Sequence, residues 1–540
     1  MTHLTTDAAR PQEAVGPLIR GLCVLRALAE AGGRGSARDL VRETGLARAT
    51  VDRVLSTLAR LGHVRPEGRD VVLAPRVMEL GNAYLAACGL PDLLGPLADR
   101  LADELDESVS LTVPDHDGVR SVREATRRRA MSVALRVGDL LPAERGGGGA
   151  LFAAGWSEDD RRCWRSRVAG DPGGGEAAAS FAERTADARE KGWSLEDRLE
   201  AGVVAVAMPV RDRGGRPVCA VNVVSHTSRH GAGSLRDAVL PRLRVTVAAM
   251  EDALAAAGDP AGTGPRTPVA SRARASKQEL GAGFLESLAR GLSVVTALGE
   301  PRAGLPLGAV AEATGLARAT ARRSLITLTH LGYVTSEAGL FRLTPQVLEL
   351  GFARLSGLTL PEIARPHLTA LVERVNDSAS MAVLAGDDIQ YVARVPTVRI
   401  MSVDITLGTR FPAHATSMGR VLLAGLPRHE RATRLKGMDL RPLTRRTVTS
   451  AERLDRLLGQ VGRAGYSLVE EELEEGLRSI AVPVRDRDGR VRAAINVSMH
   501  ASRRTADQAR ESVLPALRDA AAHIEEDLHV AGRYVGIRTA

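Results

Sequence analysis

Two segments of the chain, 270 residues apart, carry arginine and threonine at a spacing that suits contact with DNA. A guanidinium can pair bidentately with guanine, a hydroxyl can reach a phosphate or a base, and small neighbours allow close approach in the major groove. The residues concerned are Arg48, Thr50 and Arg53 in the first segment, and Arg318, Thr320, Arg322 and Arg323 in the second. Their chemistry predicts two sites for double-stranded DNA on one chain.

Helical periodicity explains how the first segment is presented. Residues 47–62 place their apolar side chains on one helical face, which leaves the arginines on the opposite face. A shorter helix at 37–43 precedes them, and Gly45 suits the turn between the two because glycine tolerates positive φ. A short hairpin, or wing, is expected after the second helix. We therefore predict winged helix-turn-helix domains at 15–75 and 283–345; a packed helical subdomain without DNA contact is the alternative.

The two predicted recognition helices differ at one position. Asp52 of the first corresponds to Arg322 of the second. A carboxylate repels phosphate, although it could accept a hydrogen bond from cytosine, whereas an arginine adds phosphate attraction. We expect the second helix to bind DNA more strongly and with a steeper salt dependence.

The rest of the chain is duplicated as well. Residues 44–50 return letter for letter at 314–320, and residues 209–213 return at 483–487, where the offset has grown to 274. The chain therefore consists of two whole copies of a multidomain unit. In each copy a linker helix is expected after the wing, at 76–90 and 346–360, and then an α/β module. The modules span 91–255 and 361–528, a flexible linker at 256–282 joins the copies, and the fold class is α+β.

Composition narrows the class of protein. The 540 residues carry a formal net charge of +8, which is compatible with a polyanionic partner, although 70 arginines against three lysines also fit a GC-rich coding bias. All four cysteines lie in the first copy without CxxC spacing, so a shared disulfide framework or zinc site is not expected. The longest apolar stretches are too short for a membrane span. We predict a cytoplasmic protein with no cofactor and no membrane partner.

The order of winged helix, linker helix and α/β module resembles the IclR family of bacterial transcriptional regulators. The second copy is similar to the branch that controls the β-ketoadipate pathway in response to aromatic acids such as protocatechuate and 4-hydroxybenzoate. The segments that carry this resemblance are residues 317–334, 391–396, 399–402, 408–424 and 471–486. The first copy aligns more loosely, from about residue 15 to 255.

The resemblance implies a dimeric or tetrameric regulator whose GAF/PAS-like module binds a small, aromatic or other, carboxylic acid and controls genes of aromatic-acid catabolism. It implies a ligand site formed by His414, Thr416, Ser417, Met418, Glu471, Ser479, Asn496 and Ser498. Hydroxyl, amide and helix N-terminal N–H groups can donate to a carboxylate, and Met418 offers an adaptable apolar wall for a ring.

The first copy departs from this pattern. Residues 414–419 correspond to Glu144, Arg145 and four glycines, and Ser479 and Ser498 correspond to Ala205 and Val224. The glycine run is not a phosphate-binding loop, because no Gly-Lys-Ser/Thr follows it. We predict one well-formed effector site and one degenerate module, which has lost this ligand or binds a different one and serves as a dimerisation scaffold.

Two other functions stay open on the sequence alone. An enzyme could use His414 with the acidic residues 470–472, but no zinc-protease or nucleophile-elbow motif is present, and such charge runs are usually solvated. A DNA-binding or scaffold protein without a ligand is the second alternative. Two DNA-binding domains on one chain also hold each other at roughly millimolar effective concentration. An intrachain pseudo-dimer is therefore expected, with a homodimer of chains left open.

Overall fold

The computed structural model describes residues 11–127, 135–170, 174–197, 202–257, 283–299, 304–397 and 405–539. The chain divides into two compact units, Met1–Gly357 and Leu358–Ala540. The first unit holds both helix-turn-helix domains and the first effector module, and the second unit holds the second effector module. Helices and four antiparallel sheets in the described residues confirm the α+β class. None of the described helices has the length and hydropathy to span a membrane.

The first DNA-binding domain has the predicted helices and wing. Gly45, with φ of 66°, ends the second helix and makes the interhelical turn. A short strand that the sequence analysis did not predict, β1, pairs with the wing. The elements are α1 (Gly16–Glu30), β1 (Arg34–Ser36), α2 (Ala37–Thr44), α3 (Arg48–Arg60), β2 (Val64–Glu67) and β3 (Asp70–Leu73).

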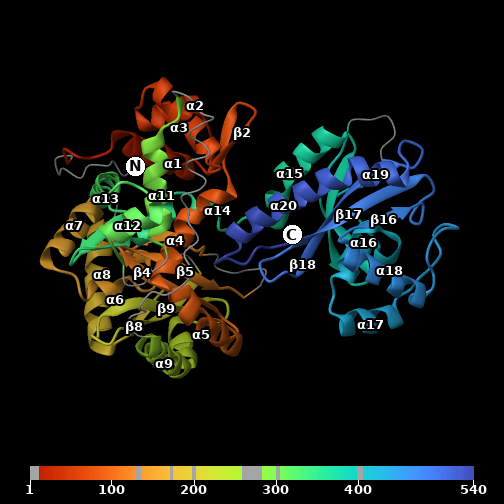
Figure 1. Cartoon of the computed structure of the whole chain (residues 1–540). Helices are drawn as coiled ribbons and strands as arrows, with labels where there is room; N and C mark the ends of the chain where they lie inside the picture. Colours follow the sequence, from red (N-terminus) through yellow and green to blue (C-terminus); the bar gives the residue numbers. More distant parts are fainter. Residues whose placement is uncertain are drawn as a thin grey trace. The chain divides into compact units, whose positions relative to one another are not determined.

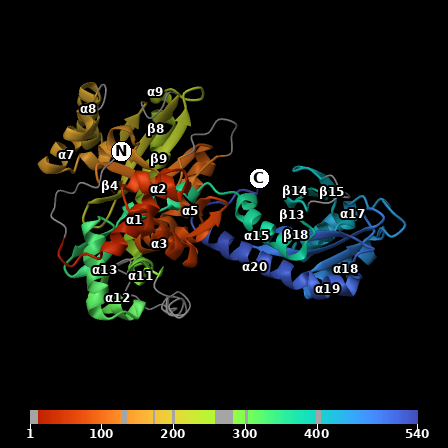
Figure 2. The ribbon, with the colours of Figure 1, turned by 90° about the horizontal axis from the view of Figure 1, so that it is seen from above.

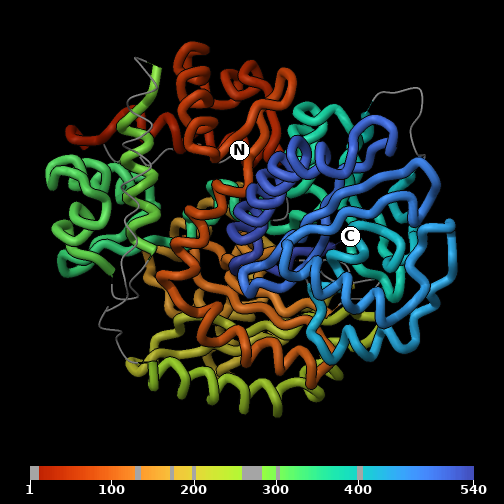
Figure 3. Tube along the Cα trace, turned by 45° about the vertical axis from the view of Figure 1, so that its right-hand side comes forward, coloured from red at the N-terminus to blue at the C-terminus, as the bar shows by residue number. Residues whose placement is uncertain are grey.

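The second DNA-binding domain repeats this order, including the additional strand. Its elements are α11 (Glu286–Ala297), β10 (Leu305–Pro306), α12 (Leu307–Thr314), α13 (Arg318–His330), β11 (Val334–Glu337) and β12 (Leu340–Leu343). Helix α11 packs against α1 of the first domain, as Figures 1 and 3 show.

Reciprocal glycine contacts join α1 and α11. A Cβ on Gly21 would lie 2.3 Å from Cδ1 of Leu288, and a Cβ on Gly291 would lie 2.3 Å from Cδ1 of Leu18. Leu18 and Leu288 are fully buried. Because both contacts follow the 270-residue offset, the two helices pack with local twofold pseudosymmetry.

The two linkers do not have the same conformation. The first forms a 3₁₀ turn, η1 (Pro75–Val77), followed by the predicted helix α4 (Met78–Cys88). The second predicted helix is interrupted, since η4 (Pro345–Glu349) and α14 (Phe352–Leu355) are separated at Gly351. That glycine has φ of 116°, and Cγ1 of Val77 lies 2.9 Å from where its Cβ would be. The two linkers pack against each other, and only the first forms a continuous helix after its 3₁₀ turn.

The first effector module is a six-stranded antiparallel sheet in the order β6-β5-β4-β9-β8-β7. Helix α9 packs along β8 (Figure 2). The elements are α5 (Leu90–Leu105), β4 (Ser108–Asp115), β5 (Gly118–Ala125), β6 (Leu140–Pro142), η2 (Ala143–Arg145), α6 (Gly149–Ala153), α7 (Glu158–Val168), α8 (Gly174–Lys191), β7 (Ser194–Glu196), β8 (Val203–Arg211), β9 (Pro217–His226) and α9 (Ala232–Ala257).

The second effector module has the equivalent sheet, β15-β14-β13-β18-β17-β16. Its elements are α15 (Leu360–Val375), β13 (Ser378–Ala385), β14 (Asp388–Val395), β15 (Arg410–Pro412), η5 (Ala413–Ala415), α16 (Ser417–Ala424), α17 (Arg428–Gly437), α18 (Ala451–Ala464), β16 (Ser467–Glu470), β17 (Leu477–Arg485), β18 (Val491–His500), α19 (Ala506–Ser512) and α20 (Leu514–Ala531).

Strand alternation assigns the faces of this second sheet. Ala382, Ala481 and Ala494 pack into one core with side chains of α16 and α18. Their strand neighbours, such as Ile480 and Ile495, point to the opposite face, where α15 and α20 pack. Side chains two residues from the core alanines therefore lie on the α16 face.

Candidate functional site

The structure presents the predicted DNA-contacting residues near the starts of two equivalent helices. Both α3 and α13 bury their apolar faces and leave the opposite faces in solvent. The arginines at positions 48, 53, 318, 322 and 323 are exposed, and Thr50 and Thr320 are half-buried. This arrangement permits entry of each helix into a major groove.

A carboxylate accompanies one arginine on each of these helices. In α3 the partner comes from the same helix, since Nε of Arg48 lies 2.9 Å from Oδ1 of Asp52. In α13 the partner comes from a distant segment, because Arg322 pairs with Glu13. Glu13 offsets the charge of Arg322 on α13. The difference in charge between the exposed faces of α3 and α13 is therefore smaller in the folded chain than the exchange of Asp52 for Arg322 alone predicts.

A large cavity lies on the α16 face of the second effector module. Its volume is about 1060 Å³. Six of the eight predicted ligand residues line it: Thr416, Ser417, Met418, Ser479, Asn496 and Ser498. Strand register brings the strand residues together, because Ser479 lies directly across from Ser498, and Asn496 lies across from Ser380.

Two buried polar atoms in the cavity wall have no hydrogen-bond partner among the described residues. They are Oγ of Ser417 and Oδ1 of Asn496, whose residues are 1% and 3% exposed. The amide nitrogen of Asn496 donates to Oγ of Ser498 at 3.0 Å, which fixes the orientation of the amide. Buried polar groups are normally satisfied, and an unsatisfied one costs about 1–3 kcal/mol. These atoms are therefore free to form hydrogen bonds within the cavity, although Oδ1 of the equivalent Asn222 in the first module is unpartnered among the described residues as well.

Two predicted residues of the loop before α16 serve the loop itself. Oγ of Thr416 accepts from the N–H of Gly419 at 3.0 Å and so caps α16. His414 is fully buried and is not among the residues that line the cavity. Its Nε2 lies 3.3 Å from the carbonyl oxygen of Arg441, and burial lowers the pKa of its imidazole. His414 is therefore neutral near pH 7.

The acidic run at 470–475 supplies a different carboxylate from the predicted one. Glu471 has φ of 55°, accepts from the N–H of Gly476, pairs with Arg446 and is not among the lining residues. The neighbouring Glu472 lines the cavity and is 9% exposed. The expectation that this run is a solvated face therefore does not hold for Glu472.

Arg420 and Glu472 form a buried ion pair that sequence reasoning missed. Nη2 of Arg420 lies 2.6 Å from Oε2 of Glu472, and Nε of Arg420 donates to the carbonyl oxygen of His414. The carboxylate also accepts from the N–H of Val448. The pair ties the loop before α16 to the segment after β16. Four further arginines, also not predicted, line the cavity: Arg394, Arg410, Arg441 and Arg503.

In the first module the glycine run occupies the equivalent place. A Cβ on Gly146 would lie 2.2 Å from Cγ2 of Val119, and one on Gly147 would lie 2.6 Å from Oδ1 of Asn222. The backbone of this loop therefore lies directly against the strands. Ser417, which corresponds to Gly147, keeps a side chain in the second module. The glycines bring the loop too close to the sheet for side chains like those of the second module.

A carboxylate also replaces an apolar wall residue in the first module. Glu196 lies across from Ala205, as Val469 lies across from Ser479. Its side chain is 1% exposed and pairs with Arg184, which also donates to the carbonyl oxygen of Glu144. Burial raises the pKa of Glu196 to about 7, against the lowering effect of Arg184. An internal ion pair therefore occupies the position of an apolar cavity wall.

This raised pKa makes the stability of the first module depend on pH. Below about pH 4.5 Glu196 is protonated in both the folded and the unfolded state, so its contribution to the free energy of unfolding is fully present. Between that pH and about 7 the unfolded state releases the proton first, and the free energy of unfolding falls by about 3 kcal/mol. Urea unfolding followed by tryptophan emission reports on this module, because all three tryptophans lie in it.

The Glu196→Gln variant is expected to lack this component of the pH dependence. Glu176→Gln, which changes an exposed carboxylate of α8, is the matched control and should keep it. Equal pH profiles for the unmodified chain and Glu196→Gln would contradict the assignment.

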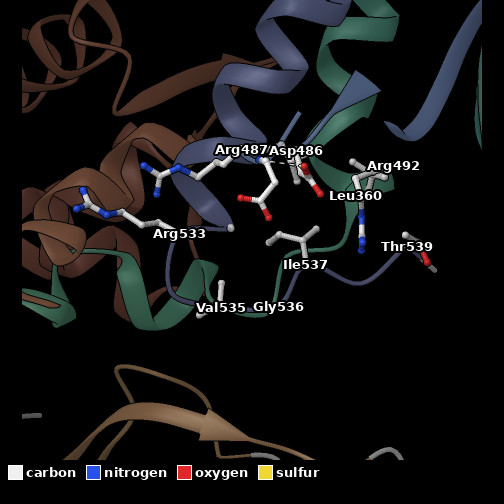
Figure 4. Close-up of a pocket in the computed structure, with 12 residues that line it drawn as sticks. Leu360, Asp486, Arg487, Arg492, Arg533, Val535, Gly536, Ile537 and Thr539 are labelled. Atoms are coloured by element: carbon white, nitrogen blue, oxygen red, sulfur yellow. Dashed lines mark hydrogen bonds between the residues drawn. The ribbon is translucent and has the colours of Figure 1, made fainter. Parts of the chain in front are cut away.

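A second cavity in the second unit, of about 430 Å³, lies beside the C-terminal tail (Figure 4). It contains none of the predicted ligand residues. Its lining combines three arginines with two aspartates, and the guanidinium groups of Arg487 and Arg533 extend away from that of Arg492. The positive charges do not converge on one point, and we assign no ligand to it.

Comparison with known proteins identifies the domains. The IclR helix-turn-helix domain matches residues 17–68 and 287–338, and the C-terminal domain of bacterial IclR transcriptional regulators matches 82–251 and 352–526. Of the predicted resemblance segments, residues 399–402 lie outside the described residues.

Curated relatives agree with these matches. The Pca regulon regulatory protein of Pseudomonas putida is 44% identical over 235 residues, which are 43% of this chain and 81% of that protein. The p-hydroxybenzoate hydroxylase transcriptional activator of Acinetobacter baylyi is 36% identical over 44% of this chain and 90% of that protein. A crystal structure of a transcriptional regulator from Rhodococcus sp. RHA1 is 48% identical, with 46% of this chain and all of that chain covered and a TM-score of 0.44. The relatives are regulators and not enzymes. The chain therefore belongs to the IclR family of transcriptional regulators and contains both domains of that family twice.

Proposed function

We propose that the chain is a transcriptional regulator that binds one small aromatic carboxylic acid, in its second effector module, and controls genes of aromatic-acid catabolism. The cavity on the α16 face is the observation that carries this proposal. It combines unpartnered polar atoms of Ser417 and Asn496 with an apolar wall. The regulators of the Pca regulon and of p-hydroxybenzoate hydroxylase, both similar to this chain, support the aromatic class of ligand.

The cavity wall matches the two ends of such a molecule. Met418, Tyr391 and Phe411 give an apolar surface for a ring, and the rings of Tyr391 and Phe411 meet edge to face with centroids 5.9 Å apart. Burial raises the pKa of Tyr391 to about 12, so its phenol adds no negative charge. The hydroxyl of Ser417 can donate to a carboxylate at the other end, and Oδ1 of Asn496 can accept from a hydroxyl group on the ring. The charges of the lining balance, since Arg394, Arg410, Arg441 and Arg503 are matched by four acidic residues.

Calorimetric titration of the full chain with 4-hydroxybenzoate and with protocatechuate tests this proposal. We expect one molecule bound per chain. Asn496→Ala should weaken binding by at least about tenfold, because it removes a buried polar group that faces the ligand. Asn222→Ala, the equivalent change in the first module, should leave the Kd unchanged.

Three results would count against it. Two equivalent molecules per chain would contradict the degenerate first module. Equal weakening by both asparagine variants would contradict the assignment to the second cavity. Absence of heat and of thermal stabilisation with both acids, in a chain that binds DNA, would favour the alternative of a regulator without an aromatic ligand.

We propose further that the two DNA-binding domains act as an intrachain pair. The reciprocal contacts of Gly21 with Leu288 and of Gly291 with Leu18 support this pairing. A pair of this kind can read two unlike half-sites, one helical turn or a multiple apart. The ligand would have to favour one placement of these domains over another, since equal affinity for both shifts nothing.

A further inference from the structure

The segments that lead into α1 and α11 cross to the recognition helix of the other copy. The N–H of Val15 donates to Oγ of Thr327 in α13 at 2.9 Å, and the N–H of Leu285 donates to Oγ of Thr57 in α3 at 3.1 Å. Both threonines are buried, and each also donates to the carbonyl oxygen four residues earlier in its own helix. The crossing is therefore a fixed part of the paired domains.

Only the first of these segments carries an acid at the position that reaches the recognition helix. Glu13 pairs with Arg322 on the exposed face of α13, while the residue equivalent to Glu13 in the second copy is Gly283. In α3 the equivalent of Arg322 is Asp52. An acid at position 283 would therefore face another carboxylate instead of a guanidinium, and the second segment has no acid there. Each recognition helix thus has one arginine neutralised, by Asp52 within α3 and by Glu13 across the pair in α13.

The Glu13–Arg322 pair is readily broken by a stronger anion. Both side chains are about half exposed, at 47% and 54%, where solvent and salt screen the attraction. A DNA phosphate that approaches Arg322 must displace the Glu13 carboxylate or accept its repulsion. The acid competes with DNA for the same guanidinium.

We propose that Glu13 is an intramolecular competitor of DNA that sets the affinity and the salt dependence of the second recognition helix. The inference rests on the proposed contact of Arg322 with DNA. While Glu13 is in place, contact with a phosphate exchanges one anion for another at Arg322. Without it, the same contact releases a bound counterion from the DNA, which steepens the dependence of log K on log salt by up to about 0.9.

The test is fluorescence anisotropy of the full chain with a duplex of mixed sequence, over a series of salt concentrations. Glu13→Gln is expected to bind severalfold more tightly at low salt, with a steeper slope, and the advantage should vanish at high salt. Glu30→Gln removes one exposed carboxylate from the end of α1 and gives the same change in net charge. It should leave affinity and slope near those of the unmodified chain.

A double-mutant cycle separates competition from a general charge effect. In an Arg322→Gln background, Glu13→Gln should have no effect, because the guanidinium for which the two anions compete is gone. The inference is overturned if Glu13→Gln behaves like Glu30→Gln, or if its gain persists in the Arg322→Gln chain. Failure of the unmodified chain to bind any duplex would instead contradict the proposed function.

Discussion

Replacement of Gly21 by leucine is expected to lower the affinity of the full chain for DNA by about 100-fold or more. The Cβ alone would lie 2.3 Å from Cδ1 of the fully buried Leu288, and a leucine side chain adds further bulk at this contact. Disruption of the α1–α11 contact removes the placement that lets both domains engage one duplex at the same time, and the avidity of about 10²–10⁴ is lost when geometry prevents simultaneous engagement. Anisotropy with a duplex long enough for both domains measures the loss.

The duplication supplies the controls for this experiment. Gly291→Leu makes the mirror-image change against Leu18 and should have the same effect. Gly233→Leu places the same side chain in α9, where no atom of the described residues lies within 4 Å of the new Cβ, and should leave DNA binding unchanged. If Gly21→Leu bound the long duplex as tightly as Gly233→Leu, the α1–α11 contact would not be what pairs the domains.

Local periodicity explains which parts of this fold could be predicted. The recognition helices follow from apolar residues at helical spacing, and Gly45 marks the turn before the first of them. Alternation in β17 and β18 places Ser479, Asn496 and Ser498 on one face, as a cavity wall requires. These features depend on neighbours in the sequence, so the sequence contains their signal.

The remaining features depend on contacts between distant residues. Glu13 and Arg322 are 309 positions apart, and no pattern in either segment indicates the pairing. Glu471 has a positive φ and pairs with Arg446, whereas Glu472 pairs with Arg420 and lines the cavity, and nothing in the run of glutamates distinguishes the two. The interruption at Gly351 has no signal in the local sequence, because the same Glu-Leu-Gly sequence remains helical around Gly81.

Loss of the Arg420 guanidinium is expected to have the largest effect on the stability of the second effector module. Arg420→Ala leaves Glu472 buried without its cation and frees the carbonyl oxygen of His414. Removal of one partner of a buried ion pair typically costs about 3–5 kcal/mol. Calorimetric melting of the full chain, with hydrogen exchange measured on peptides from 413–424, should show early unfolding of this module while the tryptophan signal of the first module is unchanged.

Two further variants distinguish the ion pair from simple loss of packing. The double variant Arg420→Met/Glu472→Met replaces both charges by apolar groups and should recover most of the lost stability, since no uncompensated charge remains. Arg184→Ala, which removes the arginine that contacts the equivalent carbonyl oxygen of Glu144, should destabilise the first module and leave the second unchanged. If the double variant were as unstable as Arg420→Ala, packing around the guanidinium rather than its charge would explain the loss. Recovery of stability together with loss of acid binding would assign Arg420 and Glu472 a second role, the placement of Ser417 beside the ligand.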